Sequence, residues 1–234
     1  MKHRRRSFAL LLLLALLPVV SLAGVAGAEE IRGRVQLLAQ GGKGPAKGSD
    51  VRDVVVYFEP ASPSPVKPAA QAFEVVTKGK SFEPRILAIP RGSRVRFPNQ
   101  DPILHNVFSV SGVNRFDLGL YRRGPGKEKR FDEAGVVRVF CNVHHDMVAY
   151  ILVLDTTFFA SPSADGEFVL TGVPRGPGRL TVWHEQAEPW TTEVRLPQSG
   201  PVTARVEVSK PRVPPHLNKT GSSYFRRDRY GKDR

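Results

Sequence analysis

Short apolar runs separated by glycine and proline restrict the fold of this chain more than any other feature of its sequence. The 234 residues include 21 glycines and 20 prolines, and strand-like runs recur between them. Examples are residues 54–58, 94–97, 136–140 and 150–154. After the N-terminal leader no stretch shows helical periodicity, and many short strands with intervening turn residues are typical of β-sandwiches. The sequence therefore predicts an all-β fold.

A proline-rich stretch divides the strand-like sequence into parts. Residues 61–74 are predicted to form an extended, semi-rigid linker. Residues 75–155, which follow, are dense in strand-like sequence, and a second β segment covers residues 156–209. The chain is therefore long enough, and divided clearly enough, for two β domains.

The second β segment has a sequence signature of its own. The phrases Asp-Gly-Glu-Phe at 165–168 and Pro-Arg-Gly at 174–176 resemble those of carboxypeptidase-regulatory-like, Ig-like β-sandwiches. The strands that normally open such a domain are found only at 29–60. We therefore expect 29–60 and 156–209 to fold together as one discontinuous sandwich, with the middle of the chain inserted into it. A simple tandem of two domains is the alternative.

The first 28 residues have the pattern of an export signal. Lys2 and the arginines at 4–6 form a positive segment, residues 8–23 are almost entirely apolar, and small residues at 26–28 offer a cleavage site. The apolar run is shorter than the ~20 residues that a spanning helix needs. We therefore expect a cleaved signal peptide over residues 1–28, an exported, periplasmic protein and no stable membrane anchor. The paired arginines leave the general and twin-arginine routes both open.

The positive charge of the chain is concentrated near its ends. The formal net charge is +13, and residues 210–234 carry eight Lys or Arg against Asp228 and Asp233. This polar stretch is predicted to be a basic, disordered tail. A basic surface can steer acidic partners, whereas the lack of a nucleic-acid-binding motif in an exported chain argues against nucleic acid as a partner.

A cluster of potential metal ligands surrounds the only cysteine. Cys141 opens a run that also contains His144 and Met147, and His105 comes from a distant turn. In an oxidising export compartment a lone thiol is buried, metal-bound or reactive. Thiolate, two imidazoles and a thioether are the ligands of a blue-copper electron-transfer site. The pattern therefore favours a metal-bound cysteine.

Residues 82–153 resemble a small cupredoxin of the plastocyanin and amicyanin type. The matching phrases are Ile-Pro-Arg-Gly-Ser at 89–93, Asn-Gln-Asp at 99–101, His-Asn-Val-Phe-Ser at 105–109 and Cys-Asn-Val-His-His-Asp-Met at 141–147. The Cys-x2-His-x2-Met spacing is similar to the short amicyanin loop. The whole chain also resembles exported plastocyanin-like proteins that are sometimes labelled methylamine-utilisation proteins. The resemblance implies a Greek-key cupredoxin sandwich or barrel with one type 1 copper on His105, Cys141, His144 and Met147.

Two neighbours of these ligands have expected roles. Asn106 matches the family asparagine whose side chain ties the two ligand loops together and tunes the metal. His145 is an alternative ligand to His144, but it would leave only Asp146 before Met147, which makes a cramped loop. We therefore expect His145 to face solvent beside the site, where it could respond to pH.

The ligand set predicts a carrier of single electrons, not an enzyme. A copper enzyme that reduces oxygen needs additional copper ions bound mainly by histidine, and only five histidines follow Glu29. Redox proteins are the expected partners, with a c-type cytochrome or a periplasmic dehydrogenase implied by the resemblance. The alternative is a copper-binding chaperone or storage protein that uses the same soft ligands.

Overall fold

The computed structural model describes residues 28–63 and 65–224. The predicted signal peptide, apart from Ala28, and the last ten residues of the predicted tail lie outside this range. Within the part that is described, no helix has the length and apolar character needed to cross a membrane.

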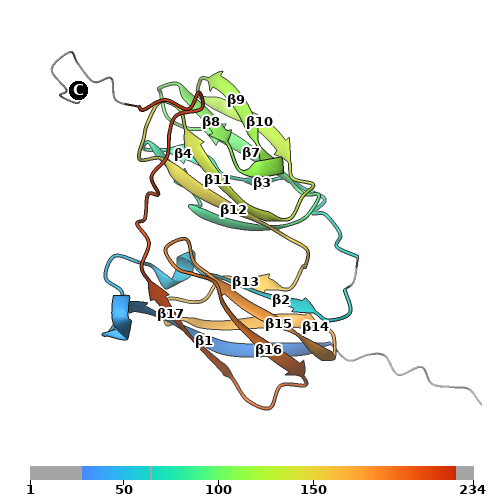
Figure 1. Cartoon of the computed structure of the whole chain (residues 1–234). Coiled ribbons are helices and arrows are strands. Elements are labelled where there is room, and N and C mark those ends of the chain that lie inside the picture. The colour runs from blue at the N-terminus through green and yellow to red at the C-terminus, as the bar shows by residue number, and fades with distance from the viewer. Residues whose placement is uncertain (1–27, 64, 225–234) are drawn as a thin grey trace, which may run out of the picture.

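Two β-sandwiches make up the structure, and the prediction of an all-β chain with two sandwiches is confirmed (Figure 1). The first is called here the terminal sandwich, because it contains the first and last strands. Its two sheets have the orders β14-β1-β17 and β13-β2-β15-β16. The strands are β1 (Glu29–Ala39), β2 (Val55–Pro60), β13 (Phe159–Ala160), β14 (Glu167–Val173), β15 (Gly176–Trp183), β16 (Trp190–Leu196) and β17 (Val202–Val208).

The second is called the central sandwich, and its sheets have the orders β10-β7-β4-β5, with β3 on β7, and β6-β12-β11-β8-β9. Its strands are β3 (Phe73–Glu74), β4 (Val76–Lys78), β5 (Ser81–Glu83), β6 (Ile86–Pro90), β7 (Arg94–Asn99), β8 (His105–Ser109), β9 (Phe116–Tyr121), β10 (Gly124–Arg130), β11 (Gly135–Cys141) and β12 (Val148–Leu154). Three short 3-10 helices, η1 (Gln40–Gly42), η2 (Val51–Asp53) and η3 (Gly112–Asn114), lie in connections.

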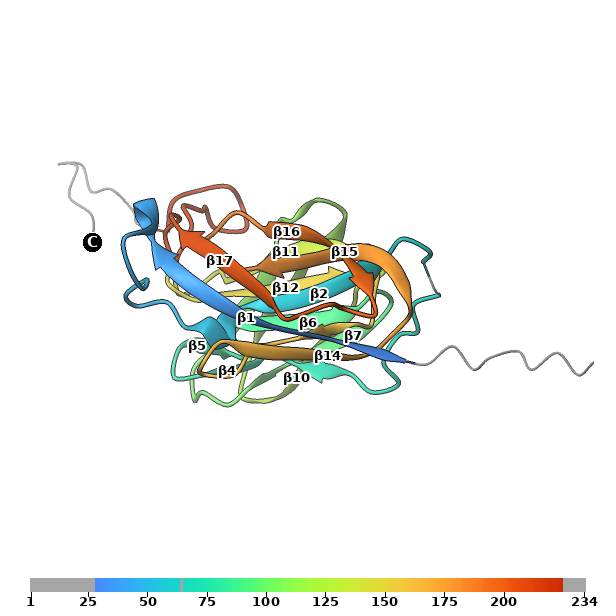
Figure 2. The ribbon, with the colours of Figure 1, turned by 90° about the horizontal axis from the view of Figure 1, so that it is seen from below.

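The terminal sandwich is discontinuous in sequence. Strand β1 pairs antiparallel with β14 and parallel with β17, and β2 pairs with β15. Figure 2, seen from the side of the terminal sandwich, shows β1 between these two partners. The central sandwich lies between β2 and β13 in the chain and begins with β3, slightly before residue 75.

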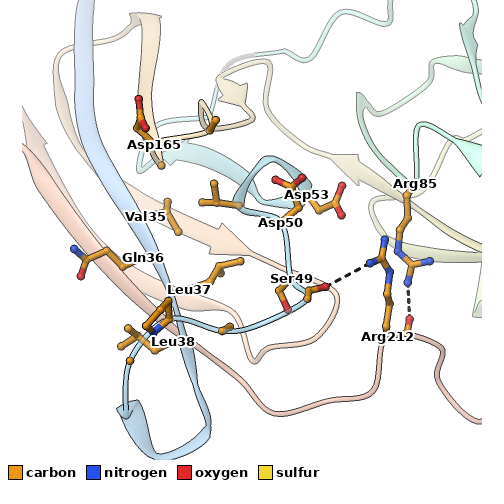
Figure 3. A pocket seen from close by; sticks show the side chains of 17 residues that line it. Val35, Gln36, Leu37, Leu38, Ser49, Asp50, Asp53, Arg85, Asp165 and Arg212 are labelled. Atoms are coloured by element: carbon orange, nitrogen blue, oxygen red, sulfur yellow. Dashed lines mark hydrogen bonds between the residues drawn. The ribbon is translucent and has the colours of Figure 1, made fainter.

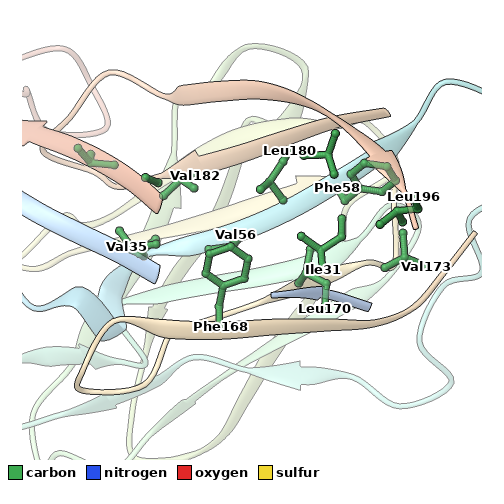
Figure 4. Packing of buried hydrophobic residues seen from close by; sticks show 14 of the residues in the cluster. Ile31, Val35, Val56, Phe58, Phe168, Leu170, Val173, Leu180, Val182 and Leu196 are labelled. Atoms are coloured by element: carbon green, nitrogen blue, oxygen red, sulfur yellow. The ribbon is translucent and has the colours of Figure 1, made fainter. Parts of the chain in front are cut away.

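Four stacked sheets enclose three apolar layers. One layer fills the terminal sandwich, where Ile31, Phe58, Phe168 and Leu180 are among the buried side chains (Figure 4). A second fills the central sandwich, and the third lies between the two sandwiches. Each layer removes apolar surface from water, which stabilises the fold by roughly 25 cal/mol for each Å² of apolar surface buried.

Strand β12 shows how the stacking follows from the sequence. Val148, Tyr150, Leu152 and Leu154 belong to the layer between the sandwiches, whereas Ala149, Ile151 and Val153 belong to the central core. Successive side chains of a strand point to opposite faces. Both faces of β12 are covered, which accounts for its unbroken apolar sequence.

Arg85 joins the two sandwiches by polar contacts. Its Nε donates to Glu185 Oε1 at 3.0 Å, its Nη1 donates to the Val148 carbonyl at 3.2 Å, and its guanidinium lies over the Tyr150 ring. Its Nη2 donates to the carbonyl of Arg212, in the segment that follows β17. Because Arg85 belongs to the central sandwich and Glu185 to the terminal one, this ion pair crosses the junction.

Residues 210–224, called here the strap, differ from the prediction of a disordered tail. They have no regular secondary structure, but they run from the end of β17 along one side of the molecule to the central sandwich (Figure 1). The prediction rested on polar composition, and it missed the contacts that His216 and Tyr224 make with rings of the central sandwich. Burial of such rings offsets the entropy of ordering a polar segment.

Candidate metal centre

Strand alternation directs two of the predicted ligands into the central core. His105 is the first residue of β8 and shares a face with Val107, and Cys141 is the last residue of β11 and shares a face with Val139. These strands are antiparallel neighbours, with Cys141 opposite Val107. Because residues two apart on a strand lie on one face, the imidazole and the thiol meet at the same end of the sheet.

His144 completes a compact group of donor atoms. Cys141 Sγ lies 3.6 Å from His105 Nδ1 and 3.7 Å from His144 Nδ1. The two imidazole rings have centroids 4.9 Å apart, and the three ligand atoms lie within 4.8 Å of one another. His105 and Cys141 are fully buried, whereas His144 is half-buried. One sulfur and two nitrogens converging in this way fit a single soft or borderline metal ion such as copper.

The loop that carries these ligands is held by its own backbone. The Cys141 N–H donates to the Met147 carbonyl, and the Met147 N–H donates to the His144 carbonyl, both at 3.3 Å. The Val143 N–H donates to Cys141 Sγ at 3.4 Å. This contact orders the loop around the sulfur atom, whose thiolate form binds metal ions.

Asp101 holds the imidazole of the buried His105 by a hydrogen bond to its Nε2. His105 Nε2 donates to Asp101 Oδ2 at 3.0 Å, and the carboxylate accepts the Gly79 and Lys80 N–H groups at 2.6 and 2.9 Å. A proton on Nε2 leaves the lone pair of Nδ1 facing Cys141, so the carboxylate selects the metal-binding tautomer. Sequence reasoning assigned no role to Asp101. The signal was present in the Asp-x3-His spacing that ends at His105.

The surroundings keep both imidazoles neutral. Burial lowers the pKa of His105, and the Asp101 carboxylate only partly opposes that change. Burial also lowers the pKa of His144, and the adjacent His105 adds to the effect. Burial works to raise the pKa of Asp101, but the hydrogen bonds from Lys80, Gly79 and His105 outweigh it and lower the pKa. Neutral imidazoles beside an ionised carboxylate are ready to bind a cation.

The side chain of Asn106 makes a different contact from the one that the resemblance implies. Its side-chain Nδ2 donates to Asp117 Oδ1 on β9 at 2.6 Å, and not to the loop that carries Cys141. The two ligand-bearing segments are instead joined by backbone, because the Asn142 N–H donates to the Asn106 carbonyl at 2.9 Å. The main chain of Asn106 therefore makes the tie that was expected of its side chain, and the tuning of the metal by that side chain stays a prediction.

Met147 and His145 belong to the same loop as Cys141 and His144. Met147 is buried in the core of the central sandwich at the end of the loop, and it stays a predicted ligand. The group of converging donors includes His144 and not His145. The ring of His145 stacks on His216 at 4.6 Å while 32% of the side chain stays exposed, so His145 faces solvent only in part.

A large pocket lies elsewhere in the described part of the chain. About 1000 Å³ in volume, it is lined by residues around η2 and by Arg85 and Arg212 (Figure 3). Two of its polar side chains have partners: Asp50 pairs with Arg52 at 2.6 Å, and Arg212 donates to the Gly48 carbonyl at 3.5 Å. None of the predicted site residues lines it.

No family model matches the chain, and no curated protein matches it. Several solved structures match part of it. A purple cupredoxin from Nitrosopumilus maritimus is 24% identical, with 35% of this chain and 99% of that chain covered and a TM-score of 0.32. A reduced, singly substituted mutant of amicyanin is 24% identical, with 42% of this chain and 98% of that chain covered and a TM-score of 0.35.

A copper-containing nitrite reductase from Thermus scotoductus SA-01 is 26% identical, with a TM-score of 0.32. The match covers 38% of this chain and only 25% of the reductase chain. All three similarities cover less than half of the present chain. The metal assignment therefore depends on the geometry of His105, Cys141 and His144.

Proposed function

We propose that the chain is a single-copper electron carrier of the cupredoxin type. The observation that carries the proposal is the convergence of Cys141 Sγ with the Nδ1 atoms of His105 and His144. The solved structures that match part of the chain include copper proteins by their titles. Bound copper would supply a one-electron couple, and a thiolate with two imidazoles suits both of its oxidation states.

The chain's own residues would set the conditions for that couple. Met147 is proposed as a fourth, weak ligand, because it ends the loop and is buried in the same core as Cys141. Asp101 would hold the imidazole of His105 in place, so that little rearrangement accompanies electron transfer. His144 is half-buried and would lie closest to a docked partner.

Transport of electrons is proposed in preference to catalysis. Further copper ions would need further histidines, and the other histidines of the described residues are occupied in packing. His184 is buried beside Glu185, and the rings of His145 and His216 stack on each other. Within residues 28–63 and 65–224, the donor cluster at Cys141 is the group that can hold a metal ion.

The partner is proposed to be an acidic redox protein outside the cytoplasm, such as a c-type cytochrome or a periplasmic dehydrogenase. Export is supported by the leader-like sequence at 1–28. Lys80 is exposed, and its charge acts on both imidazoles of the cluster. Arg122 and Arg123 are also exposed and follow Tyr121, which pairs with His105. Positive charge near the site would speed association with a negatively charged surface.

The test is anaerobic addition of Cu(II) to the protein without its leader. We expect one equivalent to bind, an intense visible band from the thiolate and reversible one-electron cycling. The Cys141→Ser variant must lose the band, and His184→Gln, which changes a histidine outside the cluster, must retain it. Colourless Cu(I) binding with ready release to a chelator would contradict the carrier and indicate copper handling.

A further inference from the structure

The strap ends against the loop that bears the ligands. From β17 it passes the junction, where Arg85 donates to the Arg212 carbonyl, and reaches the central sandwich (Figure 1). Its last turn is closed by the Asn218 side chain, whose Oδ1 accepts the Thr220 and Ser222 N–H groups at 3.0 and 2.9 Å. The strap therefore reaches the site with a defined local structure.

A column of rings connects the strap to the ligand loop. His216 lies between Phe140 and His145, with centroid distances of 4.1 and 4.6 Å and interplanar angles of 15° and 11°. Tyr224 closes the column edge-on, 5.1 Å from His145 and 5.4 Å from His216. Phe140 immediately precedes Cys141, and His145 immediately follows His144. The strap thus packs against residues next to two of the ligands.

Hydrogen bonds fix the same contact. Tyr224 Oη donates to the carbonyl of Cys141 at 3.0 Å, and the Lys219 N–H donates to Asn142 Oδ1 at 2.9 Å. Lys219 Nζ also lies 2.7 Å from Asp117 Oδ2, on the carboxylate that accepts from Asn106. Both the backbone at the cysteine and the residue after it are therefore tied to a segment about 80 residues away in sequence.

We propose that His216 and Tyr224 are positioning residues of the metal centre, which hold the ligand loop in its metal-binding conformation before any metal arrives. The loop from 141 to 147 lies beyond the end of the β11–β12 ladder, whose last pair is Phe140 with Val148. Backbone outside a ladder opens most easily, and an ordered set of ligands binds metal faster and more tightly. The identity of the metal in this inference rests on the proposed function. The contact between the strap and the ligand loop does not.

The contact is tested first in the full-length protein without metal. Hydrogen exchange of the peptide covering 141–147 is compared among the parent, Tyr224→Phe, His216→Ala and His216→Phe. Loss of one hydrogen bond in Tyr224→Phe should speed exchange about fivefold. His216→Ala should do so by a similar or larger factor, and His216→Phe, which keeps a flat ring between Phe140 and His145, should restore most of the protection.

Tyr57→Phe is the matched control, because Tyr57 lies in the terminal sandwich and bonds Thr181 there. It should leave exchange of 141–147 unchanged. Parent-like exchange in both Tyr224→Phe and His216→Ala would overturn the inference. If His216→Ala does not fold, the comparison of Tyr224→Phe with Tyr57→Phe decides the matter.

Copper separates this inference from the proposed function. Release of bound copper to a chelator should be several-fold faster from Tyr224→Phe than from the parent, with the thiolate band retained. Faster exchange of 141–147 in a protein that never forms the band would support the strap and contradict the copper carrier. Unchanged exchange and unchanged release in a protein with a normal band would support the carrier and overturn the role of the strap.

Discussion

His105 donates its Nε2 proton to Asp101 across 3.0 Å, on the side of the ring opposite the thiol of Cys141. The carboxylate is itself held by the Gly79 and Lys80 N–H groups, at the turn between β4 and β5. One hairpin turn of one sheet therefore sets the orientation of a ligand on the other sheet.

Asp101→Asn is expected to lower copper affinity by about 10- to 100-fold, because the amide cannot favour the Nε2-protonated tautomer as a carboxylate does. Competition with a chelator of known affinity measures the change. Asp132→Asn, which removes an exposed carboxylate paired with Arg130, should leave affinity unchanged. Equal affinity of Asp101→Asn and the parent would show that the carboxylate does not act through His105.

Met147→Leu tests the proposed fourth ligand. A change from Met to Leu conserves volume and should cost less than about 1.5 kcal/mol of stability. If the thioether is a weak ligand, copper should still bind while the reduction potential and the visible spectrum shift. Voltammetry and absorption measure this. A variant with the parent's potential and spectrum would remove Met147 from the ligand set.

Arg85→Ala should destabilise the protein by about 3 kcal/mol, because it leaves the carboxylate of Glu185 buried without its partner. The side chain of Glu185 is only 1% exposed, which makes the loss of its partner costly. Chemical denaturation gives the free energy of unfolding. Arg130→Ala breaks an exposed pair and should change it little. A small effect of Arg85→Ala would mean that the apolar layer alone holds the junction.

The buried His184 should make the stability of the terminal sandwich sensitive to acid. Burial lowers the pKa of His184 below its usual 6.5, so the unfolded chain takes up a proton at a higher pH than the folded one. Its contribution to stability is therefore full above about pH 6.5 and is lost as the pH falls toward the folded pKa. Denaturation at several pH values gives the free energy of unfolding. Below pH 6.5 this free energy should depend less on pH in His184→Gln than in the parent. Parallel curves for parent and variant would assign the acid sensitivity to other groups.

Docking to an acidic redox protein should depend on salt. The second-order rate of electron transfer should fall as ionic strength rises, and Lys80→Glu should lower the rate and weaken the dependence. Stopped-flow kinetics with an acidic cytochrome measure both. Arg205→Glu makes the same charge change on the exposed face of β17 in the terminal sandwich and should have a smaller effect. A rate that is independent of salt would exclude electrostatic docking.

The sequence alone predicted the features that depend on local pattern. The residue types and the Cys-x2-His-x2-Met spacing of the loop, together with the resemblance to cupredoxins, were enough to nominate Cys141 and His144 with His105, because a three-residue spacing can fold back on one ion. Gly- and Pro-separated runs likewise predicted an all-β chain. These are properties of neighbouring residues, and they are readable without knowing the rest of the fold.

Only the tertiary structure decided which distant groups support the site. Asp101 meets His105 because the β4–β5 turn, which lies outside the motif, holds its carboxylate. The backbone of Asn106, and not its side chain, ties the ligand segments, and a polar segment predicted to be disordered stacks its His216 on Phe140. Composition indicates only the average conformational entropy that is lost when a segment becomes ordered. Packing against particular rings and carbonyls determines whether that loss is offset.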